Sequence, residues 1–220
     1  EGMPVGVENN FSFFMFRSSV SIVISIGIFL SIFSCANFIP LLMEKGTIDL
    51  FLSKPISRTQ LILGRYFGGL FFVLLNVIYL VLGVWLVFAI KFGIWNFNLL
   101  WIILTITYAF ALLNSILVLF GVLTKNSIIS MMIAYLVYLV LSPILARKEF
   151  YINFIQNDII KVIVNIFYYI IPNTDSILSQ TTNDLMQGNG ITNSGTIFST
   201  LLFLIISLTL SIYIFEKKDL

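Results

Sequence analysis

The sequence predicts an all-α polytopic membrane protein, a helical bundle of about five spans. Of its 220 residues, 59% are hydrophobic and only 10% are charged, and the mean hydropathy is +1.05. A soluble globular chain keeps about a quarter of its residues charged. The apolar residues also gather into runs long enough to cross a bilayer, which takes roughly 20 residues. The expected solvent of this chain is therefore the lipid bilayer.

The composition excludes several classes of function. Twelve basic and ten acidic residues leave a formal net charge of +2, so the chain lacks the dense basic face of a nucleic-acid-binding protein, and we expect no nucleic-acid partner. It has no histidine, which excludes imidazole-ligated haem, His-based zinc sites and Ser-His-Asp triads. Its single cysteine, Cys35, cannot form a disulfide within the chain. We expect no catalytic, metal-binding or cofactor-binding site.

Five apolar runs bounded by charged residues are predicted to span the membrane. They cover residues 18–39, 61–90, 99–122, 127–145 and 196–215. None has a charge in its middle, and only the second contains a charged residue, Arg65 near its start. We expect one transmembrane domain over residues 1–220, because every run belongs to the same bundle.

Residues 151–171 are a weaker candidate for a sixth span. The segment contains two charged residues, and Asn153, Asn157, Lys161 and Asn165 recur every four residues, which places them on one stripe of a helix. We expect an amphipathic helix at the membrane surface or in an external vestibule. The alternative is a sixth span whose polar stripe faces the bundle interior, which would bring both chain ends to one side.

The distribution of basic residues predicts the orientation. The short connection at residues 41–59 contains Lys45, Lys54 and Arg58, so the positive-inside rule places it in the cytoplasm. Five spans then put the carboxyl-terminal tail in the cytoplasm and residues 146–195 outside.

Within that connection, residues 43–60 predict a short helix. Gly46 is expected to end the helix of the first span, and Thr47 to cap a new one. Positions 48–52 are too apolar for a free loop, so this helix is expected to lie on the membrane surface or against another protein. Pro55 ends it, because proline disfavours helical geometry at the residue before it.

A long helix is expected next. Ser57 and Gln60 have the spacing of a capping box. A helix from Arg58 to Ile90 is about 50 Å long, whereas the hydrocarbon core of a bilayer is about 30 Å thick. Its first turns, through Arg65, are therefore expected to stand in the cytosol or the headgroup layer. Short helix, sharp turn and long helix together form an elbow.

The elbow resembles the signature of ABC-2 type transporter permeases. In that family a Glu closes the second span, a Gly-Thr pair begins a cytoplasmic coupling helix, a Pro-x-Ser-Arg turn follows, and Gly-Lys or Gly-Arg opens the third span. The residues that carry the resemblance are Glu44, Gly46, Thr47, Asp49, Leu52, Lys54, Pro55, Ser57, Arg58 and Arg65. It extends more loosely over the whole chain, including an external helical segment that contains Ile171, Pro172 and Asn173. The family usually has six spans, so we expect that a natural span preceding residue 1 is missing.

The resemblance implies a membrane subunit that forms the substrate path and couples to a separate ABC ATPase subunit, with export as the expected direction. The chain has no Gly-x-x-x-x-Gly-Lys-Ser/Thr loop, so ATP and Mg²⁺ would be bound by the partner. A second permease copy and membrane lipid are the other expected partners, in the cytoplasmic (inner) membrane of a bacterium. Glu44 would stabilise the elbow against Arg58 or Arg65, and Lys54 and Arg58 would contact the ATPase or lipid phosphates.

Other functions stay open from the residues alone. A non-enzymatic membrane anchor or regulatory subunit of a larger complex is the alternative, and the elbow would then be its binding face. A lipid-acting enzyme is disfavoured because the spans lack clustered carboxylates or a paired nucleophile and base, and a channel because no filter motif stands out.

Two asparagines, Asn76 and Asn114, fall in the middle of predicted spans. Such amides are expected to hydrogen-bond between helices or to line a path, and packing is the simpler interpretation.

Overall fold

The computed structural model describes residues 5–43, 57–92, 95, 97–148, 150, 171–187 and 194–218. Every described element is a helix, which confirms the all-α class, and five helical segments are long and apolar enough to cross a membrane. These segments are Ser18–Leu42, Arg58–Lys91, Ile102–Thr124, Ser127–Ala146 and Gly195–Lys217. Each boundary agrees with the predicted span to within one helical turn. The candidate sixth span lies almost entirely outside the described residues.

The first span consists of two helices. α1 (Val5–Cys35) and α2 (Phe38–Leu42) are separated by a turn at Ala36 and Asn37. Pro40 has no N–H group to donate to the carbonyl of Ala36, so an unbroken helix would leave that carbonyl without its usual partner. The predicted helix end at Gly46 lies outside the described residues, and the first break comes before it.

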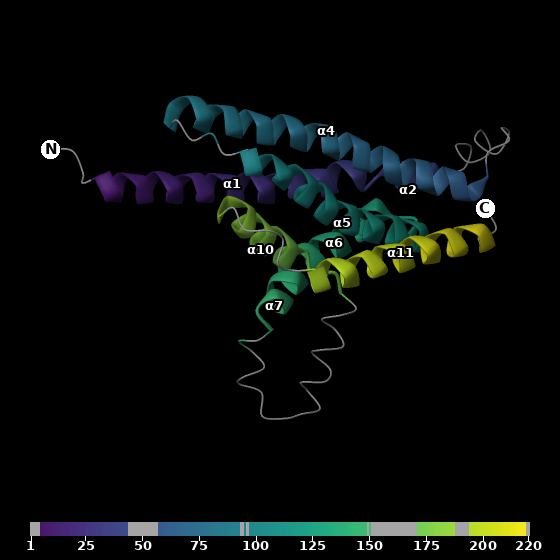
Figure 1. Cartoon of the computed structure of the whole chain (residues 1–220). Coiled ribbons are helices and arrows are strands. Elements are labelled where there is room, and N and C mark those ends of the chain that lie inside the picture. The colour runs from purple at the N-terminus through teal and green to yellow at the C-terminus, as the bar shows by residue number, and fades with distance from the viewer. Residues whose placement is uncertain are drawn as a thin grey trace.

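The second span, α4 (Arg58–Phe92), lies on one side of the bundle and leads through the 3₁₀ turn η1 (Phe97–Trp101) into α5 (Ile102–Thr124). α5 is the central helix and contacts α1, α4, α6, α10 and α11 (Figure 1). Its buried residues include Ala109, Ala111, Ser115 and Gly121, and small residues let neighbouring helices approach closely.

The fourth span changes its winding in the middle. α6 (Ser127–Leu136) passes into a π-helical turn, η2 (Val137–Leu141), and then into α7 (Ser142–Ala146). Pro143 stands at the start of α7, and its missing N–H group breaks the regular hydrogen-bond ladder. π-helices occur mostly as single turns inside α-helices, and in membrane spans such local adjustments help to satisfy the backbone groups that a proline frees.

The last described elements are α10 (Thr174–Gln187) and α11 (Ser194–Lys217). α10 packs against α5, α7 and η1. Asn173 caps α10, because its side-chain oxygen accepts a hydrogen bond from the Ser176 N–H at 3.1 Å, and the Ser142 hydroxyl oxygen accepts one from the Asp175 N–H at 2.6 Å. A helix following residues 171–173 agrees with the segment that the family resemblance implies.

The ends of several helices meet at one end of the bundle, on the right in Figure 1. They are the end of α2, the start of α4, the ends of α5 and α11, and the start of α6. We call this the elbow end, because residues 44–56 connect α2 to α4 there. The positive-inside rule predicts that it faces the cytoplasm.

Candidate coupling site at the start of α4

The structure describes only the second half of the predicted elbow. Ser57, Arg58 and Arg65 lie within the described residues. The others, Glu44, Gly46, Thr47, Asp49, Leu52, Lys54 and Pro55, lie outside them. The roles predicted for those residues, including a contact between Glu44 and Arg58 or Arg65, therefore stay predictions. What the structure shows is how the two ends of the elbow are anchored.

α4 begins with the predicted capping box. The Gln60 backbone N–H donates to the Ser57 hydroxyl oxygen at 3.2 Å, and the Ser57 backbone N–H donates to the side-chain oxygen of Gln60 at 3.1 Å. The box satisfies two N–H groups that a helix start would otherwise leave without a partner. It fixes the residue at which the long helix begins.

Arg58 ties the start of α4 to the end of α11. Its Nη1 group donates to three backbone carbonyls at the end of the chain: Phe215 at 3.4 Å, Glu216 at 3.2 Å and Lys218 at 2.8 Å. The last carbonyls of a helix have no partner within it and carry the negative end of the helix dipole. A guanidinium group therefore satisfies them by hydrogen bonding and by charge.

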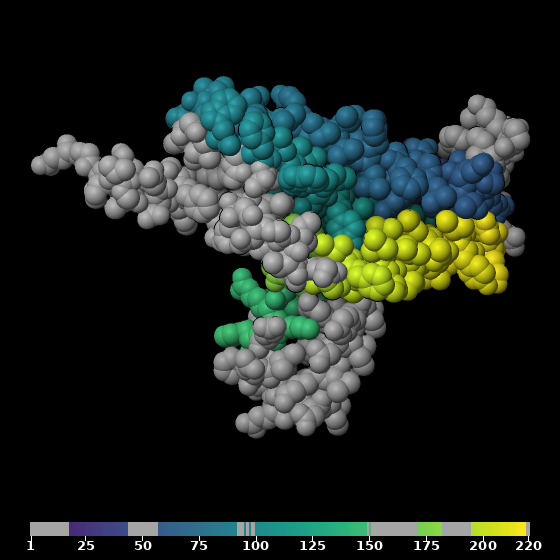
Figure 2. Space-filling view, in the orientation of Figure 1, coloured from purple at the N-terminus to yellow at the C-terminus, as the bar shows by residue number. Residues whose placement is uncertain are grey.

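A second contact joins the same two helices. The Thr59 hydroxyl donates to the Glu216 carboxylate at 2.7 Å. Figure 2 shows α11 running alongside the first half of α4 up to this point. Two successive residues of α4 are thus joined to the residues that end α11.

Lys218 extends the tie to α5. Its ammonium group donates to the backbone carbonyls of Val122 and Leu123, in the last turn of that helix. The pKa of Lys218 is lowered, mainly because the group is partly removed from water and further because the positive charge of Lys125 is near. The ends of α4, α5 and α11 are consequently held together by a chain of hydrogen bonds, which we call the tail clasp: Arg58, Thr59, Glu216 and Lys218.

An apolar cluster lies beneath the tail clasp and includes both ends of the elbow. Its buried members are Ile39, Leu42, Met43, Ile62, Tyr66, Val118, Val122 and Phe215. Met43 is the last described residue before residues 44–56, and Ile62 lies one turn into α4. The helices on both sides of residues 44–56 therefore pack on one surface, which is formed mainly by α5 and α11.

The next turns of α4 pack closely on α5. Gly69 faces Asn114, whose side-chain nitrogen donates to the Tyr66 carbonyl at 3.1 Å, and the Tyr66 hydroxyl donates to the Ala111 carbonyl at 3.1 Å. Asn114 thus hydrogen-bonds between α5 and α4, which is the simpler of the two roles expected for it from the sequence. Arg65 is half-buried one turn before Gly69.

Sequence reasoning identified the cap and Arg58, and it missed the partners of Arg58. The expected contact of Arg58 with an ATPase or lipid phosphate stays a prediction, and in the structure its Nη1 group is engaged within the chain. The available signal was the cluster Glu216, Lys217 and Lys218 directly after the last span. Among the described residues, no group of three or more Cys, Asp or Glu side chains is placed to hold a metal ion.

Comparison with known proteins identifies the family. A family model described as "ABC-2 family transporter protein" matches residues 42–220, which include the elbow, the tail clasp and four of the five candidate spans. No curated protein and no solved structure matched the chain. The match describes an integral membrane subunit without a catalytic domain of its own. The chain belongs to the ABC-2 family of transporter proteins.

Proposed function

We propose that this chain is the permease subunit of an ATP-driven exporter, and that the elbow transmits the motion of a separate ATPase subunit to three spans at once. Residues 44–56 would dock on the ATPase, which binds ATP and Mg²⁺. Two permease copies, identical or related, would enclose the substrate path in the cytoplasmic membrane, as in a bacterial inner membrane.

The observation that carries the proposal is the contact of Arg58 with the end of α11. α4 begins at Arg58, two residues after residues 44–56, so any displacement of that segment acts first on the start of α4. Since Arg58 and Thr59 bind the end of α11, and Lys218 binds the end of α5, the same displacement pulls on all three helices. Packed helices do not deform continuously, so we expect α4, α5 and α11 to shift together when the start of α4 is displaced.

The test measures motion far from the elbow and does not require a known substrate. The full natural chain would be purified together with its ATPase, with Cys35→Ala to remove the native thiol. A cysteine is then introduced by Phe198→Cys, at an exposed position at the other end of α11. We expect ATP with vanadate to change the rate of maleimide labelling at this cysteine.

Two variants make the test specific. Arg58→Gln should remove most of the nucleotide-dependent change while the ATPase still copurifies. Lys217→Gln is the matched control, because it removes one positive charge beside the tail clasp from a side chain that lies over the ring of Tyr213 at 4.5 Å. An Arg58→Gln protein that keeps the full response would contradict transmission through the tail clasp. A preparation that contains no ATPase would favour the anchor or regulatory subunit instead.

A further inference from the structure

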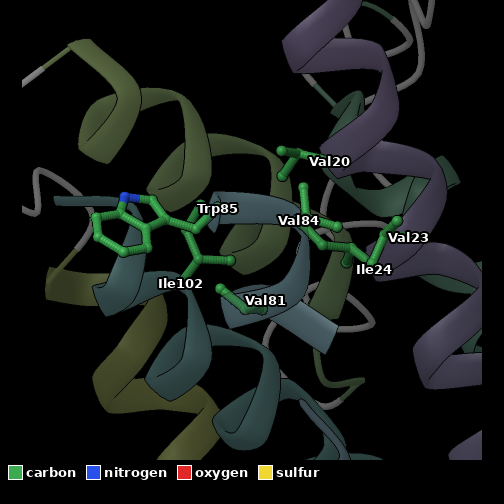
Figure 3. A pocket seen from close by; sticks show the side chains of 7 residues that line it. All are labelled: Val20, Val23, Ile24, Val81, Val84, Trp85 and Ile102. Carbon is green, nitrogen blue, oxygen red and sulfur yellow. The ribbon is translucent and has the colours of Figure 1, made fainter. Parts of the chain in front are cut away.

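A groove runs along the line where α1 meets α4. Its stretch farthest from the elbow end is narrow and entirely apolar, and Figure 3 shows valines of both helices facing each other beside Trp85. The lining residues of this stretch are Val20, Val23, Ile24, Val81, Val84, Trp85 and Ile102. A second stretch shares Val23, Ile24 and Val81 with the first and adds Gly27, Val77, Leu80 and Ile106. The two stretches therefore adjoin, and the second lies closer to the middle of the spans.

Toward the elbow end, the groove widens into a polar notch. The notch has a volume of about 250 Å³ and shares Gly27, Val77 and Leu80 with the narrow stretch. Its other lining residues are Leu30, Ser31, Ser34, Phe72, Val73 and Asn76. Large exposed side chains, Leu30 and Phe72, form part of its rim. The hollow is thus bordered by lipid-facing surface.

The notch is expected to lie inside the membrane, because inner residues of two candidate spans line it. Ser34 is at the end of α1, eight residues before the first span ends at Leu42, and Asn76 is near the middle of α4. Ser34 and Asn76 are both exposed. At this depth no water is present to satisfy polar groups, so exposing them to hydrocarbon costs free energy.

The hydrogen bonds of these residues determine what the notch offers to a ligand. The Ser31 hydroxyl donates to the Gly27 carbonyl at 2.7 Å, and the Ser34 hydroxyl to the Leu30 carbonyl at 2.9 Å. The side-chain nitrogen of Asn76 donates to the Phe72 carbonyl at 2.8 Å. A serine hydroxyl has a single hydrogen, so what remains on both serines is acceptor capacity. The Asn76 amide adds its oxygen as a further acceptor and keeps one N–H that the bond to Phe72 does not use. Acceptors therefore predominate in the notch, and the complement is a group that can donate a hydrogen bond, such as a hydroxyl or an amide.

We propose that this groove binds a membrane-dissolved amphiphile whose donor group, a hydroxyl or an amide N–H, occupies the polar notch while its hydrocarbon chain lies along the apolar stretch. From Val20 to Ser34 the groove extends about 21 Å along α1, somewhat more than half of the roughly 30 Å hydrocarbon thickness. The chain would point away from the elbow end. This is the orientation of a molecule that comes from the leaflet at the elbow end and moves deeper.

The proposal goes beyond ATP coupling, because it concerns binding alone. Its test uses neither an ATPase nor a nucleotide, so failure of one proposal leaves the other standing. The purified chain is placed in phosphatidylcholine vesicles, because this headgroup has no N–H or O–H donor. The probes are hexadecanol carrying a diazirine close to the hydroxyl end of its chain, so that the reactive carbon lies at the notch, and the methyl ether of the same molecule, which lacks the donor.

After irradiation, labelled residues are located by mass spectrometry. We expect the alcohol to label Leu30, Phe72 and Leu80 about three- to fivefold more than the ether does. This ratio corresponds to the free energy that one hydrogen bond contributes in a membrane interior. The double variant Ser34→Ala with Asn76→Leu should abolish this preference, and Asn76→Gln alone should retain it.

The control is Thr209→Val on α11. Thr209 is exposed, and its hydroxyl donates to the Ile205 carbonyl at 2.9 Å, in the same way as Ser34 donates to Leu30. This variant should leave the labelling of the notch unchanged. Equal labelling by alcohol and ether would overturn the proposal, as would a preference that survives the double variant. A disulfide-linked dimer of the Ser34→Cys protein, made with Cys35→Ala, that excludes both probes would instead assign the groove to a second copy of the chain.

Discussion

Gly121 of α5 and Ile39 of α2 approach so closely that a Cβ atom on the glycine would lie 3.1 Å from the Cβ of the isoleucine. Ile39 is 3% exposed, and its Cβ is fixed by the backbone, so it has little freedom to move away. The contact is possible because a residue without a side chain stands where the broken first span crosses the central helix. It holds the span that leads into the elbow against α5.

Gly121→Ala should therefore destabilise the protein. Overpacking costs about 1–3 kcal/mol, and the better helix propensity of alanine offsets about 1 kcal/mol of this, so we expect a net loss of up to about 2 kcal/mol. Thermal unfolding in detergent micelles would measure it. Gly64→Ala is the control, since a Cβ there would meet no atom within 4 Å and alanine should be neutral or stabilising. Equal stability of both variants would contradict the close contact.

Removing the cap of α4 should loosen the start of this helix without unfolding the bundle. Ser57→Ala deletes the hydroxyl that accepts from the Gln60 N–H, a change that costs about 1 kcal/mol at a helix start. Hydrogen exchange at the first turn of α4 should become faster by up to about fivefold. Ser57→Asp keeps an acceptor and should exchange as the natural chain does. Unchanged exchange in Ser57→Ala would show that the cap is dispensable.

Lys125 should be replaceable by glycine with a gain in stability. It follows α5 in the left-handed conformation, with φ of 55°, which is unfavourable for residues that carry a side chain. Its positive charge also lies near Lys218. Lys125→Gly should raise the free energy of unfolding by about 1 kcal/mol.

Lys125→Ala separates the two contributions. It removes the charge but keeps the side-chain strain, so it should stabilise less than glycine does. In both variants the pKa of Lys218 should rise toward its usual value, which titration of the ammonium group by NMR would follow. A destabilised Lys125→Gly protein would indicate that the lysine side chain makes a contact that outweighs its strain.

Stability should fall as the pH rises through the titration range of Asp175. Burial raises the pKa of this carboxyl group, and the charge of Arg147 lowers it in part. The folded state therefore holds the proton more tightly than the unfolded state does. Its contribution to stability is present in acid and is lost as the pH rises from about 3.8, the usual pKa of the unfolded group, through the raised value.

Asp175→Asn should remove this dependence and increase stability at neutral pH. The comparison is made by thermal unfolding of both proteins at several pH values between about 4 and 7. The difference between them should be largest at the neutral end. A larger difference in acid would mean that the interaction with Arg147 outweighs the effect of burial.

The spans were predictable because each depends on one local quantity, a run of apolar residues that matches the thickness of the bilayer. The cap of α4 was predictable for a similar reason, since Ser57 and Gln60 are three residues apart. Pro40 and Pro143 gave local signals for the break after α1 and for the π turn. These breaks were not predicted, because the apolar runs continue through them.

The tail clasp was not predictable in the same way. Arg58 and Lys218 are 160 residues apart, and what brings them together is the packing of α4 and α11 on α5. The polar notch depends on which faces of α1 and α4 lie beside each other. Asn76 and Asn114 look alike in the sequence, yet the first is exposed beside the notch and the second is 3% exposed and bonded to α4. Only the helix arrangement distinguishes them.

Most acceptors of the tail clasp are peptide carbonyls, and this has an evolutionary consequence. Every residue type provides a carbonyl, so positions 122, 123 and 215 can change their side chains without losing their acceptor role toward Arg58 or Lys218. The two cationic donors, Arg58 and Lys218, have no such freedom. Homologous chains are therefore expected to keep a cation at the positions of Arg58 and Lys218 while the helix ends that they hold drift in sequence.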